Sequence, residues 1–227
     1  MSINQVVTVC FDPGTDADWF AASEKVHHLM QANGTPARRF HVRHRRLIGW
    51  LTRFFGYYLV DTARTLGAVT VAAGGRKGRL DLTGTATKAA NGATLRWRAF
   101  NAHINQHTPA ARPWEDFLAQ HRAAPTKLTM DEARRRFEQQ PRVLAMLAYP
   151  GYVFNPYELA VYQAGEATYI GLYWRIALIG DALITSDGRV LRPVSDSVAD
   201  RFRFLNDACS YLHSLRSNAQ LCAIAIG

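Results

Sequence analysis

Apolar and aromatic positions are most concentrated between residues 141 and 194, where turn signals interrupt them. Pro150-Gly151 favours a turn, and Ser186-Asp187-Gly188 separates two short apolar runs as a β-hairpin does. From this pattern we predict buried strands over residues 169–174 and 176–184, followed by a hairpin at the Asp-Gly pair. This stretch is expected to form the core of the fold.

The amino-terminal pattern changes from strand to helix. Residues 5–11 read as a first strand. A helix carrying apolar positions up to Met30 is expected next, with Thr15 or Asp16 as its cap and Asn33-Gly34 as its stop.

Short apolar runs separated by glycines dominate residues 57–100, which favours several short strands. Residues 40–45 alternate loosely and also suggest a strand. We interpret residues 74–78 as a flexible turn, and Asn91-Gly92 as a hairpin turn before a strand over 94–100.

Helix signals mark residues 108–140 and the carboxyl-terminal part. Pro113 suits the first position of one helix. Thr129-x-x-Glu132 is a capping box for another, whose arginines have acidic neighbours at helical spacing and are expected to form a self-paired, solvated face. A long amphipathic helix should follow Asp196, and residues 221–226 should form a last strand.

These elements predict an α+β fold with a mixed, largely antiparallel sheet and helices packed against it. We expect one domain over residues 1–227, with a basic β-rich part (37–100), a helical insertion (108–140), and a core sheet with the carboxyl-terminal helix (141–227).

Composition indicates a folded soluble protein. Apolar residues make up 48% of the 227 residues and charged residues 20%, and no segment reads as a signal peptide or a membrane span. The three cysteines are widely spaced, which favours a reducing compartment. We therefore expect a cytoplasmic protein; the sequence leaves its oligomeric state open.

The net charge of +9 is concentrated in one segment. Residues 37–98, called the basic segment below, carry 13 Lys and Arg against Asp61 and Asp81, a net charge of +11, whereas the remainder carries −2. A field of this kind attracts an acidic partner, either a phosphate backbone or an acidic protein surface.

Motifs of known chemistry are not evident. The glycine-rich stretch at 74–78 lacks the spacing and the Ser or Thr of a phosphate-binding loop, and His103 with His107 lacks the glutamate of a zinc protease motif. We expect no catalytic residues, no cofactor and no metal.

Aromatic residues interleave with the basic ones, as in a docking surface or a groove for single-stranded nucleic acid. A solvated basic face with the aromatic residues in the core is the third interpretation. The candidate partner-binding residues are Arg43, Arg45, Arg46, Trp50, Arg53, Arg96 and Arg98.

Four short motifs occur in a suggestive order: residues 59–68 (LVDTARTLGA), Arg96-Trp97-Arg98, residues 154–161 (FNPYELAV), and residues 188–194 (GRVLRPV) after an apolar stretch. In these the chain resembles the plasmid fertility-inhibition factors, by which one plasmid blocks the conjugative export of a co-resident plasmid. The resemblance implies binding to the coupling protein, the hexameric ATPase that feeds DNA to a type IV secretion channel. It implies no catalytic residues.

We therefore expect a non-enzymatic inhibitor that acts through protein–protein contact. The alternative is a single-strand DNA-binding protein or a nucleotide-dependent nuclease of the ParB/sulfiredoxin type, for which the sequence offers no counterpart of the Gly-Cys-His-Arg loop or of a ParB box. A regulatory partner of another acidic protein is a third candidate.

Overall fold

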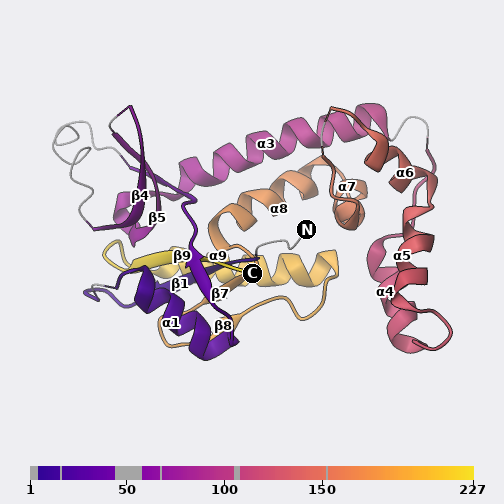
Figure 1. Cartoon of the computed structure of the whole chain (residues 1–227). Helices are drawn as coiled ribbons and strands as arrows, with labels where there is room; N and C mark the ends of the chain where they lie inside the picture. Colours follow the sequence, from indigo (N-terminus) through magenta and orange to yellow (C-terminus); the bar gives the residue numbers. More distant parts are fainter. Residues whose placement is uncertain (1–4, 16, 44–57, 67, 105–107, 152) are drawn as a thin grey trace. The chain divides into compact units, whose positions relative to one another are not determined.

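The computed structural model describes residues 5–15, 17–43, 58–66, 68–104, 108–151 and 153–227. Within these residues, nine strands form one mixed, mostly antiparallel sheet accompanied by helices, which confirms the predicted α+β class (Figure 1). The strands are β1 (Gln5–Phe11), β2 (Gly34–Pro36), β3 (Phe40–Val42), β4 (Leu59–Thr65), β5 (Ala68–Arg76), β6 (Leu80–Asp81), β7 (Ala182–Ile184), β8 (Val190–Leu191) and β9 (Gln220–Ile226). The helices are α1 (Trp19–Met30), α3 (Leu82–His103), α4 (Trp114–Ala123), α5 (Met130–Glu138), α6 (Pro141–Ala148), α7 (Leu159–Gln163), α8 (Glu166–Ile179) and α9 (Val198–Ser214), with 3₁₀ turns η1 (Lys77–Arg79) and η2 (Pro156–Glu158).

The chain divides into two compact units. Unit 1 contains residues 1–89, 174–194 and 200–227 and holds the whole sheet; unit 2 contains residues 90–173 and 195–199 and is helical. The expected helical insertion at 108–140 lies within unit 2.

Strands β1 and β9 are central to the sheet of unit 1. The order is β6-β3-β5-β9-β1-β7-β8, with β2 also pairing with β9 and β4 with β5; β1 and β7 are parallel and the other pairs antiparallel. The four consecutive residues 7–10 of β1 are all fully buried. Since successive side chains of a strand point to opposite faces, both faces of the sheet are covered at this point.

Helix α1 covers one face. Its buried Ala22 and Val26 pack with Val7 and Val9 of β1 and with Ile224 of β9 in one apolar cluster. Val7 lies opposite Ile224 in the β1–β9 register, so their side chains share a face. The period-3.6 pattern of the helix and the period-2 pattern of the strands together produce this layer.

On the opposite face, the hydroxyl of the buried Thr8 donates a hydrogen bond to the carbonyl of Leu178, near the end of α8. Burial of this polar side chain is tolerated because the hydroxyl has an acceptor. The last residues of α8 therefore contact the sheet.

The backbones of β5 and β9 approach each other so closely at Gly74 that only glycine fits at this position. A Cβ there would lie 2.1 Å from the carbonyl oxygen of Leu221 in β9, well inside van der Waals contact. Residues 74–76 pair with β9, so the turn that we predicted at 74–78 is wrong in its first half: the glycines belong to a strand. Glycine serves there because it lets two strands meet without a side chain between them.

The strands predicted over residues 169–174 and 176–184 are wrong, except at the end of the second. Residues 166–179 form α8, and only Ala182–Ile184 is a strand. Nearly every residue of α8 is buried or half-buried. A helix that is covered on all sides has no polar face, so its apolar run resembles that of a buried strand.

The strand predicted over residues 94–100 is also wrong, because Asn91-Gly92 lies inside α3 instead of forming a turn. Six alanines, the strongest helix formers, are distributed along α3. Asn-Gly indicates a hairpin only between strand-forming segments, and the flanks of this pair favour helix.

Other local predictions are confirmed. The β7–β8 hairpin encloses Asp187-Gly188, and the Oγ of Thr129 accepts a hydrogen bond from the N–H of Glu132 at 3.2 Å, as in the expected capping box. The first helix is present, but Asp18 is its cap and the left-handed Gln31 ends it, so Gly34 is free to start β2.

Candidate binding surface

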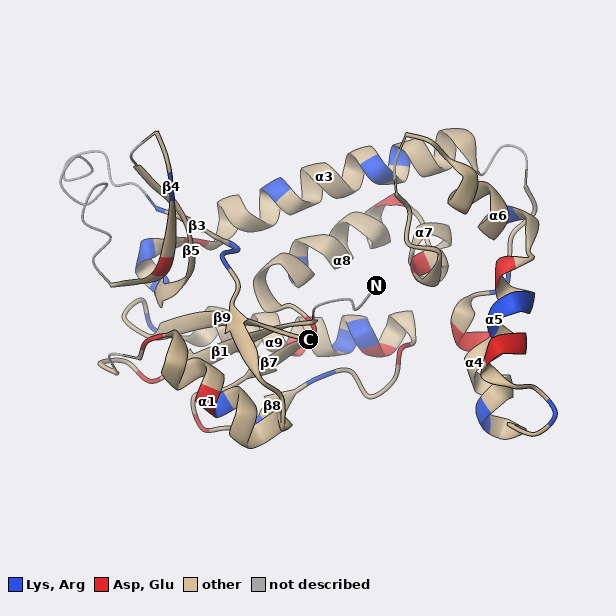
Figure 2. Ribbon diagram, in the orientation of Figure 1, with Lys and Arg blue, Asp and Glu red and all other residues tan. Residues whose placement is uncertain are grey.

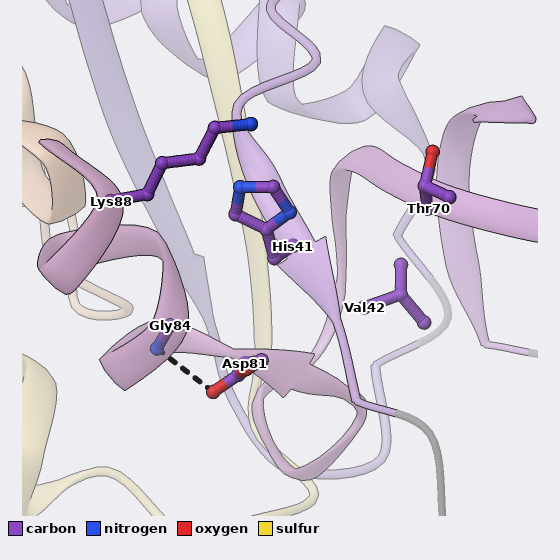
Figure 3. Close-up of a pocket in the computed structure, with 6 residues that line it drawn as sticks. All are labelled: His41, Val42, Thr70, Asp81, Gly84 and Lys88. Atoms are coloured by element: carbon purple, nitrogen blue, oxygen red, sulfur yellow. Dashed lines mark hydrogen bonds between the residues drawn. The ribbon is translucent and has the colours of Figure 1, made fainter. Parts of the chain in front are cut away.

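An open hollow of about 350 Å3 lies beside the amino-terminal end of α3 in unit 1. Residues of β3, β5, β6 and α3 line it: His41, Val42, Thr70, Asp81, Gly84 and Lys88 (Figure 3).

Hydrogen bonds hold the wall of the hollow in place. The Oδ1 of Asp81 accepts a bond from the N–H of Gly84 at 3.0 Å, an N-cap interaction. The buried Thr85 accepts from the N–H of His41 at 2.8 Å and donates to the carbonyl of Asp81 at 2.9 Å. A Cβ on residue 84 would lie 2.2 Å from the Asp81 carboxylate, so the compact cap depends on glycine.

The hollow offers hydrogen-bond donors. Figure 3 shows the ammonium group of Lys88 extending toward the ring of His41, whereas the carboxylate of Asp81 turns to the amide of Gly84. The Asp81 charge is thereby committed to the helix terminus, where the dipole favours an anion. A cation beside an imidazole can bind an anionic group such as a side-chain carboxylate.

Of the candidate residues from the sequence, Arg43 directly follows β3 and is exposed. Its N–H donates to the carbonyl of Arg79 at 2.9 Å, which brings the two backbones together. The candidates Arg45, Arg46, Trp50 and Arg53 lie outside the described residues.

Several cations of the basic segment bind other groups of unit 1. Arg38 makes a two-pronged ion pair with Asp61, with nitrogen–oxygen distances of 2.9 and 2.8 Å. The guanidinium carbon of Arg76 lies 3.5 Å from the centre of the Tyr58 ring, a cation–π contact. These charges stabilise the chain itself as well as contributing to its surface.

Two further cations are placed at helix ends. Lys77 donates to the carbonyls of His213 and Leu215 at 2.8 and 2.6 Å, at the end of α9, and burial lowers the pKa of this ammonium group. Arg39 donates to the carbonyl of Ile176 in α8, and burial lowers its pKa to about 10. Positive groups at these positions complement the helix dipoles.

Three cations of the segments that contribute to the hollow differ from these: Lys88 lines it, Arg43 follows the lining residue Val42, and Arg79 lies two residues before Asp81. Among the residues that the structure describes, the side chains of Arg43, Arg79 and Lys88 make no hydrogen bond or ion pair. Arg43 and Lys88 are exposed, whereas the Nε of Arg79 is buried and has no hydrogen-bond partner among the described residues. Figure 2 shows the Lys and Arg positions along α3 in blue.

The candidate Arg96 lies in unit 2 and contacts a row of tyrosines. Its Nε donates to the hydroxyl of Tyr169 at 3.4 Å, and its guanidinium lies 4.7 Å from the centre of the Tyr173 ring. The hydroxyl of Tyr169 donates in turn to that of Tyr162 at 2.8 Å. Burial raises the pKa of Tyr162, and the hydroxyl of Tyr173 donates to the carboxylate of Glu158.

Its neighbours differ in exposure. The Nε1 of Trp97 donates to the carbonyl of Tyr162 at 3.1 Å, so this ring is held inside unit 2. The last candidate residue is Arg98, whose side chain is 69% exposed and forms an ion pair with Glu166 at 3.4 Å. Exposed pairs of this kind contribute little to stability. The triplet Arg96-Trp97-Arg98 thus combines two anchored side chains with one solvent-facing cation.

Sequence reasoning missed His41, Asp81 and Lys88. The signal that could have found them was the pair Asp81 and Gly84, an N-cap residue followed three positions later by the amide that it binds. The interpretation of residues 57–100 as several short strands concealed the helix start.

No cluster of three or more His, Cys, Asp or Glu suited to a metal ion occurs among the described residues. The pair His103 and His107 cannot be placed, because His107 lies outside them.

No family model, curated protein or solved structure matches the chain. In the described part of the chain, no helix combines the length and the apolar character that crossing a bilayer requires.

Proposed function

We propose that the protein acts by binding an acidic partner protein at the surface formed by His41, Arg43, Arg79 and Lys88, without catalysing a reaction. The observation that carries this proposal is a hollow of about 350 Å3 lined by His41 and Lys88, with the exposed Arg43 directly following the lining residue Val42. A carboxylate entering the hollow gains donors from His41 and Lys88, and the surrounding positive field speeds encounter with an acidic surface.

We further propose, from the four motifs in which the chain resembles the fertility-inhibition factors, that the partner is the coupling ATPase of a conjugative secretion system. The protein would then block conjugative DNA transfer of a co-resident plasmid. This identification of the partner rests on the sequence resemblance, and the chemistry of the surface supports only its acidic character.

The test is co-purification of the protein with a conjugative coupling ATPase, together with the frequency of plasmid transfer. In the variant Arg43→Glu/Lys88→Glu we expect loss of both binding and inhibition. The matched control Arg122→Glu/Lys127→Glu reverses two exposed charges of unit 2 and should retain both. Equal behaviour of the two double variants would refute the proposed surface.

A DNA-binding function gives a different result. Fluorescence anisotropy with a labelled single-stranded oligonucleotide should show weak binding with little salt dependence. Tight binding that falls steeply between two salt concentrations would replace the protein partner by nucleic acid, because neutralised phosphates release counterions.

A further inference from the structure

Residues 108–112 (Thr-Pro-Ala-Ala-Arg), called the strap below, precede α4 in unit 2 and belong to no helix or strand. Backbone groups outside regular structure need other partners. Here side chains supply them.

Two glutamine side chains pair with the main chain of the strap. The carboxamide of Gln163 accepts from the N–H of Ala111 at 3.0 Å and donates to its carbonyl at 2.9 Å. The carboxamide of Gln140 does the same with Arg112, at 2.8 and 3.0 Å. Each carboxamide thus reproduces the two-bond pairing that a neighbouring antiparallel strand would make.

The two glutamines bind opposite edges of the strap. In an extended chain the N–H and C=O groups of one residue point to one side and those of the next residue to the other. Because Ala111 and Arg112 are consecutive, Gln163 and Gln140 flank the main chain on both sides. These contacts involve no strap side chain, so they would form with any extended peptide.

A buried arginine completes the clamp. Arg142 is 5% exposed; it donates from Nη1 to Gln163 at 2.8 Å and from Nη2 to the carbonyl of Thr108 at 2.5 Å. Its Nε is buried and has no hydrogen-bond partner in the described part of the chain. Burial lowers the pKa of Arg142, and no carboxylate of the described residues opposes this effect. A buried cation without a counter-ion is costly.

We infer that Gln140, Gln163 and Arg142 form a binding site for an extended peptide, that the strap occupies this site as an internal ligand, and that the site fits a partner segment with an acidic residue in place of Thr108. The main-chain bonds exchange one for one between strap and peptide. The acidic side chain adds a charge-assisted bond to Arg142, whereas in the strap the hydroxyl of Thr108 donates to the carbonyl of Ile104 at 2.5 Å and Arg142 binds only the main-chain carbonyl of Thr108.

The strap competes strongly because it is tethered beside its site, so its effective concentration is high. The experiment therefore loosens the strap and leaves the clamp intact. In the variant Ala111→Pro, the strap loses the N–H group that donates a hydrogen bond to Gln163, and the proline ring occupies the space of that bond. The control Ala110→Pro removes none of the hydrogen bonds described above.

The probe is the fluorescein-labelled peptide Asp-Pro-Ala-Ala-Arg-Pro with blocked ends, followed by anisotropy. We expect binding to Ala111→Pro at least about tenfold tighter than to the unchanged protein or to Ala110→Pro, because the strap no longer competes. The same peptide with Thr in the first position should bind about tenfold more weakly, as expected for a lost bond to a charged group. Adding Gln163→Leu should abolish binding.

If Ala111→Pro gives a native circular dichroism spectrum and binds neither peptide, the clamp has only a structural role and the inference fails. Binding that survives Gln163→Leu, or a preference for the Thr peptide, overturns the site or its acidic specificity. If the variant does not fold, hydrogen exchange of the unchanged protein decides. Millimolar acidic peptide should accelerate exchange at the Ala111 and Arg112 amides, and unchanged exchange refutes the inference.

Discussion

Replacing Gly92 by alanine tests whether this position belongs to a helix or to a turn. In α3 the new Cβ would meet only the Nη1 atom of Arg96, at 3.5 Å, which is ordinary contact with the end of a flexible side chain. Alanine is more favourable than glycine inside a helix by about 0.8–1.0 kcal/mol. We therefore expect Gly92→Ala to raise the free energy of unfolding by about 1 kcal/mol, or the melting temperature by about 2–4 °C for a chain of this size.

Urea denaturation followed by far-ultraviolet circular dichroism measures this change. Had Asn91-Gly92 formed a hairpin turn, the glycine would adopt a positive φ, and alanine would destabilise the protein by about 1–2 kcal/mol. The two structures thus predict opposite signs. A decrease in stability would refute the helical assignment of residues 91–92 and the contact distance on which the estimate rests.

Three further predictions follow from other contacts. Gly74→Ala should lower the free energy of unfolding by about 3 kcal/mol, because its Cβ would overlap the Leu221 carbonyl oxygen at 2.1 Å and a hydrogen-bonded strand cannot move aside; a loss below about 1 kcal/mol in a urea titration would contradict this packing. Asp81→Ala should cost about 1 kcal/mol in the same assay, whereas Asp81→Asn, which keeps an accepting oxygen for the Gly84 amide, should cost less; equal losses would show that the cap is not used. Burial raises the pKa of the Cys10 and Cys222 thiols to about 12, from an ordinary value near 9, so their contribution to stability is complete below that ordinary value and is lost as the pH rises toward 12. The free energy of unfolding should therefore decrease less between pH 8 and pH 10 in the Cys10→Ala/Cys222→Ala variant than in the unchanged protein. An equal decrease would show that burial does not raise the pKa of these thiols.

The concentration of positive charge in the basic segment was visible in the sequence, but its division between internal and external roles was not. Arg38 and Lys77 carry the same charge as Arg43 and belong to the same basic segment. In the structure, however, Arg38 pairs with Asp61 and Lys77 binds the end of α9. Of the described sequence-derived candidates, Arg43 follows the lining residue Val42, whereas His41 of β3 and Lys88 of α3 line the hollow together only in the folded chain.

Local signals were sufficient where one residue pattern has one physical solution. The β-branched run in Gln5–Phe11, the capping box at Thr129 and the Asp187-Gly188 pair specify a strand, a helix start and a turn, respectively, through interactions within a few residues. Such features are determined by the sequence itself, because steric preferences and nearby hydrogen bonds decide them.

Tertiary structure decided the elements whose pattern has two solutions. The apolar residues of α8 would suit a buried strand, and they form a helix that is covered on nearly all sides. The parallel pairing of β1 with β7 joins segments about 170 residues apart, as the Thr8–Leu178 hydrogen bond does. The strap and its glutamine clamp likewise join residues 111 and 163. No short-range preference encodes these contacts, because they are selected by the burial of apolar surface and the pairing of buried polar groups in the complete chain.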